Sequence, residues 1–334
     1  MGGEPDNFFS DEIAGAPHPM QTTKIIGHIS QKVDFLNCFA ENRIPQCWLL
    51  AGDRGIGKAS FAWQVSKFLL TTTHKPTDLK IDLNSKDLNS ILEPQSGGTL
   101  SRIISGSEQR VYIVRRGYNE SRKTFFKNIS IDEIRKLQSY CSLSMTDGGK
   151  RIIIIDSVDD LNKSSGNALL KLLEEPPTNT LFLLISHKSN LLLSTIKSRC
   201  QKLSFSSLNE ADLAAVLATI GCKVNQTEEN ALHILSQGSA GAACRLINSN
   251  CINLYKDILN ITSSLPTLNI NKTLQLNQDY FVKAKSNNFE IFFEMMQQFF
   301  SRLCKTGAMQ STNLPSVSNE EEKIMTCLLY TSDA

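Results

Sequence analysis

The 334-residue sequence lacks long apolar runs, an excess of either charge and closely spaced cysteines. Its longest apolar stretches, such as residues 152–155 and 181–185, fall far short of the ~20 residues that cross a bilayer. Residues 1–20 contain acidic residues and prolines, without the basic and then apolar pattern of a signal peptide. The sequence therefore predicts a cytoplasmic protein that has no membrane partner.

Charge is nearly balanced along the chain. There are 35 Lys and Arg residues against 33 Asp and Glu residues, which gives a formal net charge of +2. No global basic field would draw such a chain onto nucleic acid. Any contact with DNA must therefore be local or shared with partner proteins.

The nine cysteines are scattered singly, with no C-x-x-C pair. A disulfide scaffold would be denser, and a structural zinc site needs four thiolate or imidazole ligands at close spacing. The five histidines are equally dispersed. We expect reduced thiols and no metal site.

Short apolar runs alternate with amphipathic stretches as far as residue 205. The runs that predict strands are residues 48–51, 111–114, 152–155, 181–185 and 203–205. Between these strands, apolar residues recur at helical spacing. One of the helices is predicted to start with a capping box formed by Ser130 and Glu133. Residues 71–107 are polar and are interpreted as an insertion or long loop. Alternation of this kind predicts an α/β fold with a mostly parallel sheet covered on both faces.

The strand pattern ends at about residue 206, and the rest of the chain reads as helical. Residues 209–219, 227–237 and 241–248 form a small helical unit, and residues 252–329 form a further one. Within the latter, Phe292, Met296 and Phe299 form either a core face or an interface, and the core interpretation is favoured. Residues 327–334 resemble a translated sequencing adapter, so they are excluded here and the native C-terminus is expected to be missing.

A glycine-rich turn follows the first strand. It reads GDRGIGKAS over residues 52–60, and Gly52, Gly55 and Gly57 allow backbone N–H groups to surround a phosphate at a helix N-terminus. Lys58 would reach the outer phosphates. The alternative is a glycine turn that only joins a strand to a helix, with Lys58 solvated.

Two groups needed for hydrolysis are missing from this loop and its partner strand. A hydroxyl that would hold Mg²⁺ is expected after the lysine, but Ala59 stands there and Ser60 lies about 100° further round the helix. The partner strand ends in Asp156, followed by Ser157 instead of a catalytic glutamate. The next acids, Asp159 and Asp160, are interpreted as charges at a helix start. The sequence argues against fast hydrolysis and leaves ATP binding open.

Two further motifs carry a family resemblance. They are GNALLKLLEEPP over residues 166–177 and STIKSRC over residues 194–200. Together they resemble the clamp-loader branch of the AAA+ proteins, and most closely the delta-prime subunits of bacterial DNA polymerase III in their alphaproteobacterial form. The resemblance covers residues 22–250.

The resemblance implies a domain plan. A flexible arm (1–21) would precede a RecA-like AAA+ P-loop NTPase-like domain (22–205). A helical lid (206–250) and a C-terminal helical collar (251–330), judged to be truncated, would follow. The family often carries four zinc-binding cysteines between the phosphate loop and the acidic strand. Only Cys141 lies there in this chain, so zinc is not expected.

The resemblance also implies roles for individual residues. Arg199 of the SRC motif would point across a subunit interface into a neighbour's ATP site, where a guanidinium stabilises transition-state charge. The alternative is a surface arginine that pairs with the carbonyls of its own helix. Ser186, or else His187, stands nearest to the family's γ-phosphate sensor. Gly241 replaces the sensor arginine of the lid.

These features favour a non-hydrolysing clamp-loader subunit that donates Arg199 to a neighbouring ATPase. Its implied partners are the gamma/tau and delta subunits, with the sliding clamp and primed DNA contacted through the complex. Alternatives are a gamma/tau-like motor that binds Mg²⁺·ATP through Lys58 and Asp156, and a separate recombinase or repair ATPase. The intermediate case, in which ATP binds without hydrolysis, also stays open.

Overall fold

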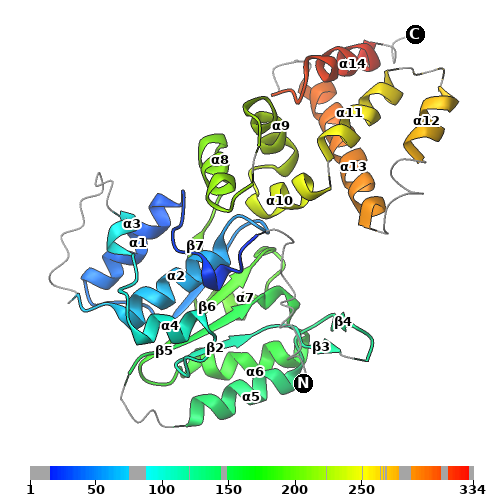
Figure 1. Ribbon diagram of the computed structural model, residues 1–334. Helices are drawn as coiled ribbons and strands as arrows, with labels where there is room; N and C mark the ends of the chain where they lie inside the picture. Colours follow the sequence, from blue (N-terminus) through cyan, green and yellow to red (C-terminus); the bar gives the residue numbers. More distant parts are fainter. Residues whose placement is uncertain are drawn as a thin grey trace, which may run out of the picture. The chain divides into compact units, whose positions relative to one another are not determined.

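The computed structural model describes residues 16–74, 88–119, 121–143, 149–222, 224–249, 251–263, 265, 267, 269–277, 287–309 and 315–330 (Figure 1). The described residues divide into two compact units, Pro17–Ser207 and, together with Ala16, the residues from Leu208 onward. Most of the predicted arm lies outside the described residues, and its end includes the short 3-10 helix η1 (Pro19–Gln21). No described helix is both long and apolar enough to cross a membrane.

The first unit is built on a parallel sheet. Its strands are β1 (Cys47–Ala51), β2 (Val111–Val114), β5 (Arg151–Asp156), β6 (Thr180–Ser186) and β7 (Gln201–Ser204). Their order is β2-β5-β6-β1-β7, and every pairing is parallel. The predicted α/β fold class and all five predicted strands are confirmed, with small shifts at the ends.

Both faces of this sheet are buried, which explains why its strands are continuous apolar runs. Side chains alternate between faces along a strand. In β5, Ile152 and Ile154 therefore join one core cluster, while Ile153 and Ile155 join another. A charge at any of these four positions would break one of the two cores.

Helices cover the sheet on both sides (Figure 1). On one face lie α1 (Ile29–Ala40) and α2 (Lys58–Thr71), and on the other lie α5 (Ile131–Ser142), α6 (Lys163–Glu174) and the short α7 (Ser194–Lys197). The helix α5 begins where the capping box predicted it, since the Ser130 hydroxyl accepts the Glu133 N–H at 3.3 Å. The helix α6 ends just before the predicted stop at the two prolines.

The interpretation of residues 71–107 as a loop is wrong for part of that segment. Two short helices lie there, α3 (Leu88–Ile91) and α4 (Gly98–Ile104), while residues 75–87 are outside the described ranges. Leu88, Leu92 and Ile103 are buried in the same core cluster as α1 and α2. A few apolar residues in a polar segment are enough to dock it, and no helical periodicity was visible in so short a stretch.

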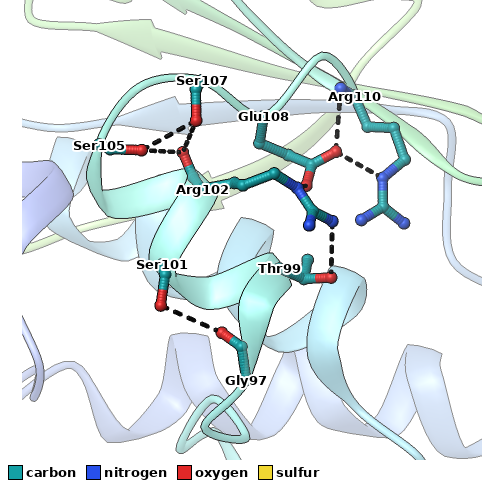
Figure 2. A network of polar contacts seen from close by, with 8 residues as sticks. All are labelled: Gly97, Thr99, Ser101, Arg102, Ser105, Ser107, Glu108 and Arg110. Atoms are coloured by element: carbon teal, nitrogen blue, oxygen red, sulfur yellow. Dashed lines mark hydrogen bonds and ion pairs between the residues drawn. The ribbon is translucent and has the colours of Figure 1, made fainter.

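A carboxylate joins α4 to the start of β2 (Figure 2). Glu108 is 8% exposed, and its two oxygens lie 3.1 Å from Arg102 Nε and 2.7 Å from Arg110 Nε. The hydrogen bond from Arg110, followed by that from Arg102, holds the pKa of Glu108 below its ordinary value against the effect of burial. This charged junction lies directly before the edge strand β2, which begins at Val111.

The second unit is entirely helical in its described part. Its helices are α8 (Glu210–Thr219), α9 (Gln226–Ser236), α10 (Ala240–Asn248), α11 (Cys251–Thr262), α12 (Ile270–Asn277), α13 (Asn287–Met309) and α14 (Asn319–Tyr330). The three lid helices predicted from the sequence are confirmed as helices. The predicted boundary at residue 250 falls inside this one compact unit, and α14 includes residues that the sequence analysis had excluded.

The candidate core face formed by Phe292, Met296 and Phe299 lies in α13. Phe299 is 1% exposed, and Phe292 and Met296 pack against the same core, as the favoured interpretation predicted. Its neighbour Phe300 is 52% exposed. The two phenylalanines therefore provide a matched pair on one helix.

We expect Phe299→Ala to lower the free energy of unfolding by about 3–5 kcal/mol, because it removes a buried ring and leaves a cavity. Phe300→Ala should change it by less than about 0.5 kcal/mol. Chemical denaturation of the full chain measures both. Equal effects of the two substitutions would contradict the assignment of Phe299 to the core.

Candidate functional site

The candidate phosphate site lies at the carboxyl ends of three adjacent strands. In the sheet register Ala51 of β1 pairs with Ser186 of β6, and Asp156 of β5 pairs with Ile185. The strands therefore bring the glycine-rich loop, Asp156 and Ser186 together at the carboxyl-terminal end of the sheet. These are the residues that the sequence analysis had assigned to a single site.

The loop between β1 and α2 needs its glycines. A side chain at Gly52 would place its Cβ 2.4 Å from the carbonyl oxygen of Phe205, while the Gly52 N–H bonds the Ser186 carbonyl at 3.2 Å. Gly55 and Gly57 have φ angles of 78° and 103°, in the region that favours glycine. The loop is thus shaped by close backbone contact as well as by conformational need.

Lys58 is turned onto the loop itself. Its Nζ lies 2.7 Å from the Gly52 carbonyl oxygen and also bonds the carbonyl of Asp53. The side chain is 2% exposed, so the alternative of a solvated lysine is wrong. Burial lowers its pKa from 10.5 to about 8, although Asp156 and Asp53 act in the opposite direction. The group expected to reach a phosphate therefore already has partners in the protein.

The lowered pKa predicts a pH effect on stability. Between about pH 8 and pH 10.5 the unfolded chain binds more protons at Lys58 than the folded chain, so this residue makes the free energy of unfolding rise with pH. One such proton gives at most ~1.4 kcal/mol per pH unit. Lys58→Met should remove this contribution, measured as the difference from wild type in denaturation at pH 8, 9 and 10. The exposed Lys202→Met is the control, and parallel curves for Lys58→Met and wild type would contradict the prediction.

Asp159 has a role that the sequence analysis missed. It belongs to a 3-10 turn, η3 (Val158–Asp160), and not to the start of the following helix, which begins at Lys163. Its carboxylate accepts the Ser186 hydroxyl at 2.8 Å and also the His187 N–H. The end of β6 is thereby fixed to the turn after β5. The sequence signal for this role was the position of Asp159, an acidic residue three positions after the end of β5.

His28 is a second residue that the sequence did not single out. Its ring Nε2 lies 2.7 Å from the Ile56 carbonyl oxygen, and the ring packs edge-on against Phe205. It also lies beside Gly57, where an added Cβ would be 3.6 Å from the same nitrogen. The segment before α1 therefore supports the phosphate loop from outside.

The positions noted for missing groups are part of well-packed structure. Ala59 is in the first turn of α2, Ser157 is buried after β5, and Gly241 is buried in α10 of the second unit. Over the described ranges, no cluster of three His, Cys, Asp or Glu side chains could hold a metal ion. The residues present therefore fit Mg²⁺ poorly, because Ala59, and not a hydroxyl-bearing residue, directly follows Lys58.

Arg199 lies in the turn between α7 and β7. Its Nη1 donates to the Thr195 carbonyl at 2.9 Å, and its Nη2 lies 2.6 Å from Glu174 Oε1. Glu174 is the last residue of α6 and belongs to the EEPP motif, so the two motifs of the resemblance meet at this ion pair. In the single chain Arg199 thus bonds a carbonyl of its own helix, as the alternative interpretation described, and holds a carboxylate as well.

Arg199 lies where the strands of the sheet begin, and the phosphate loop lies where they end. The strand β7 begins at Gln201, which pairs with Trp48 near the start of β1, whereas the loop follows the end of β1. At about 3.3 Å per residue, the four residues from Trp48 to Gly52 alone separate them by ~13 Å. Arg199 cannot act on a phosphate held by its own loop.

Comparison with known proteins identifies relatives over the first unit and beyond. Residues 28–209, more than half of the chain, match the protein family described as DNA polymerase III, delta subunit. A DNA polymerase III subunit gamma of Buchnera aphidicola subsp. Schizaphis graminum is 27% identical over 258 residues, covering 75% of this chain and 64% of the relative. A DNA polymerase III subunit delta' of Buchnera aphidicola subsp. Acyrthosiphon pisum is 31% identical over 212 residues, covering 62% and 58%.

Both matches span less than two thirds of the relative's own length. Among solved structures, a DNA polymerase III gamma subunit-related protein of Thermotoga maritima aligns with a TM-score of 0.42 at 15% identity. That alignment covers 90% of this chain and 98% of the other.

Proposed function

Because the chain belongs to the DNA polymerase III delta-subunit family, we propose that it is a non-hydrolysing, delta-prime-type subunit of the clamp loader. It would donate Arg199 to the ATP site of a neighbouring subunit while the sliding clamp is loaded onto primed DNA. Its partners would be the gamma/tau and delta subunits in the cytoplasm, with the clamp and DNA contacted through the complex.

The position of Arg199 is the observation that carries this proposal. It lies at the amino edge of the sheet, away from its own phosphate loop, with its side chain 32% exposed. Its hydrogen bonds to Thr195 and Glu174 use two of the five N–H donors of the guanidinium, and other donors are left for a second ligand. A permanently charged group that is exposed and remote from its own site supports action on a neighbour.

The state of the phosphate loop supports the absence of hydrolysis. Ala59 and Ser157 stand where a metal-holding hydroxyl and a catalytic glutamate would be needed, and Lys58 bonds the Gly52 and Asp53 carbonyls. The proposal is compatible with ATP bound at this loop without cleavage. Zinc has no part in it.

The second candidate function is a gamma/tau-like motor. It is favoured by the retained Gly57, Lys58 and Asp156 at one sheet edge, and by the similarity to a DNA polymerase III subunit gamma. It has no account of the missing hydroxyl and glutamate. We therefore place it second.

The test is reconstitution with gamma/tau and delta subunits, a sliding clamp and primed DNA. We expect DNA-stimulated ATP turnover to need this chain, and the purified chain alone to have negligible turnover. Turnover of ~1 s⁻¹ or more by the chain alone, lost in Lys58→Ala, would favour the motor. Full turnover in a complex that lacks the chain would exclude both candidates.

A further inference from the structure

A hairpin outside the phosphate site carries an unusual concentration of charge. Residues 115–127 contain five basic residues and one acid, Glu120, a net charge of +4 on a chain whose total is only +2. The basic residues are Arg115, Arg116, Arg122, Lys123 and Lys127. The rest of the chain therefore carries −2, and this segment is a local basic site on a protein without a basic field.

The segment folds as a short antiparallel hairpin that projects from the edge of the sheet after β2 (Figure 1). Its strands are β3 (Tyr118–Asn119) and β4 (Thr124–Phe125). The turn is closed by Asn119, whose side-chain oxygen accepts the Arg122 N–H at 3.0 Å. A two-stranded hairpin is marginal by itself, so its anchoring to the domain matters.

The base of the hairpin is tied to the turn after β5. Arg116 Nε lies 3.4 Å from Asp160 Oδ2, and the N–H of the buried Ile129 bonds the Asp160 carbonyl at 2.8 Å. Asp159 in the same turn holds Ser186, as described above. The hairpin is therefore anchored to the turn between β5 and α6.

Two aromatic rings are exposed among the charges. Tyr118 is 40% exposed and packs edge-on against Phe125 with ring centroids 5.0 Å apart. Phe126 is 51% exposed, and Gly117 allows its ring to lie close to the backbone, since an added Cβ there would be 3.3 Å from Phe126 Cδ2. Among the described residues, no carboxylate forms an ion pair with Arg122, Lys123 or Lys127.

We propose that the β3–β4 hairpin is a binding site for single-stranded DNA. Exposed Arg and Lys side chains neutralise phosphates, and exposed aromatic rings stack with unpaired bases, whose faces a duplex does not offer. An acidic protein partner would also fit the charges, and aromatic rings are common in protein interfaces, so the test below includes an acidic polypeptide. This inference goes beyond the proposed function, which requires DNA contact only through the complex.

The test measures binding of a fluorescent oligo-dT of about 20 nucleotides to the full chain by anisotropy, at several salt concentrations. Arg122→Ser with Lys123→Ser should make the slope of log K against log salt shallower by about 1.4, at ~0.7 per lost phosphate contact. The matched control is Lys256→Ser with Lys305→Ser, two exposed lysines of the second unit, which should leave the slope unchanged.

A second pair of variants separates stacking from apolar packing. Phe126→Leu should weaken binding roughly 5- to 150-fold, the range for loss of one stacked base, whereas Phe126→Tyr should retain it. Duplex DNA of the same length should bind more weakly and should be insensitive to Phe126→Leu.

Three results would overturn the proposal. These are no binding of oligo-dT at low salt, binding that neither hairpin variant alters, and binding of poly-glutamate with the same dependence on Arg122 and Lys123. The last would identify an acidic protein partner instead. None of them would affect the proposed clamp-loader role, which is tested by ATP turnover in the complex.

Discussion

Replacing Arg199 with alanine should lower DNA-stimulated ATP hydrolysis at the neighbouring subunit's site by ~10³-fold, the range for an arginine that acts in trans. The loss is expected because a neighbour's γ-phosphate would lose its charged fork during hydrolysis. Assembly should be unaffected, since Arg199 lies on the surface and pairs with Glu174 in an exposed ion pair. Turnover is measured in the complex, and assembly by size-exclusion chromatography.

Two controls make this result specific. Arg199→Lys keeps the charge without the planar fork and should recover only part of the rate. Arg135→Ala removes another exposed arginine of the same unit, paired with Asp132 at 3.1 Å, and should leave turnover unchanged. An undiminished rate in Arg199→Ala would remove this residue from the proposed role.

The second large effect is expected in the helical unit, where a charge is fully buried. Glu321 is 0% exposed. Its oxygens accept hydrogen bonds from Arg302 Nε at 2.7 Å, from Arg302 Nη2 at 3.0 Å and from the Tyr255 hydroxyl at 2.5 Å. The same contacts join α11, α13 and α14. Arg302→Met should lower the free energy of unfolding by about 3–5 kcal/mol, because it leaves the carboxylate buried without its cation.

The reason for that loss can be tested with a second substitution. Arg302→Met combined with Glu321→Gln removes both charges and keeps an acceptor for Tyr255, so it should be more stable than Arg302→Met alone. The exposed ion pair of Arg135 with Asp132 provides the control, because Arg135→Met should lower the free energy of unfolding by no more than ~1 kcal/mol. Chemical denaturation and amide hydrogen exchange of α11, α13 and α14 measure the effect. A double variant less stable than the single one would contradict the explanation by an unpaired charge.

The sheet was predictable because its strands are buried on both faces. Runs such as residues 152–155 contain no polar residue, and no exposed element of a domain this size would tolerate that pattern. The small helices α3 and α4 were not predicted, because each is docked on the core by only one or two apolar residues. The hairpin of β3 and β4 has strands of two residues, too short for any period to be visible.

The site was predictable as a set of residues but not as a set of contacts. The order of motifs along the chain indicated the family, and the match over residues 28–209 confirms that resemblance. The strand ends then bring Gly52, Asp156 and Ser186 together. The bonds from Lys58 to its own loop depend on side-chain direction, which no spacing rule specifies.

The hydrogen-bond partners of Asp159 and Glu174 could not be predicted from the sequence either. Each is bound to a residue 27 or 25 positions away, Ser186 and Arg199 respectively. Such pairs are created by the return of the chain along a parallel sheet. Sequence periodicity describes neighbours within one element and cannot assign partners between elements.

The most direct test of the account compares two variants of this chain in one assay of the reconstituted complex. Lys58→Ala should leave DNA-stimulated ATP turnover at the wild-type rate, because the phosphate loop of this subunit does not hydrolyse ATP. Arg199→Ala should lower the turnover, because the neighbouring site loses its arginine. Loss of turnover in Lys58→Ala together with full turnover in Arg199→Ala would contradict the account.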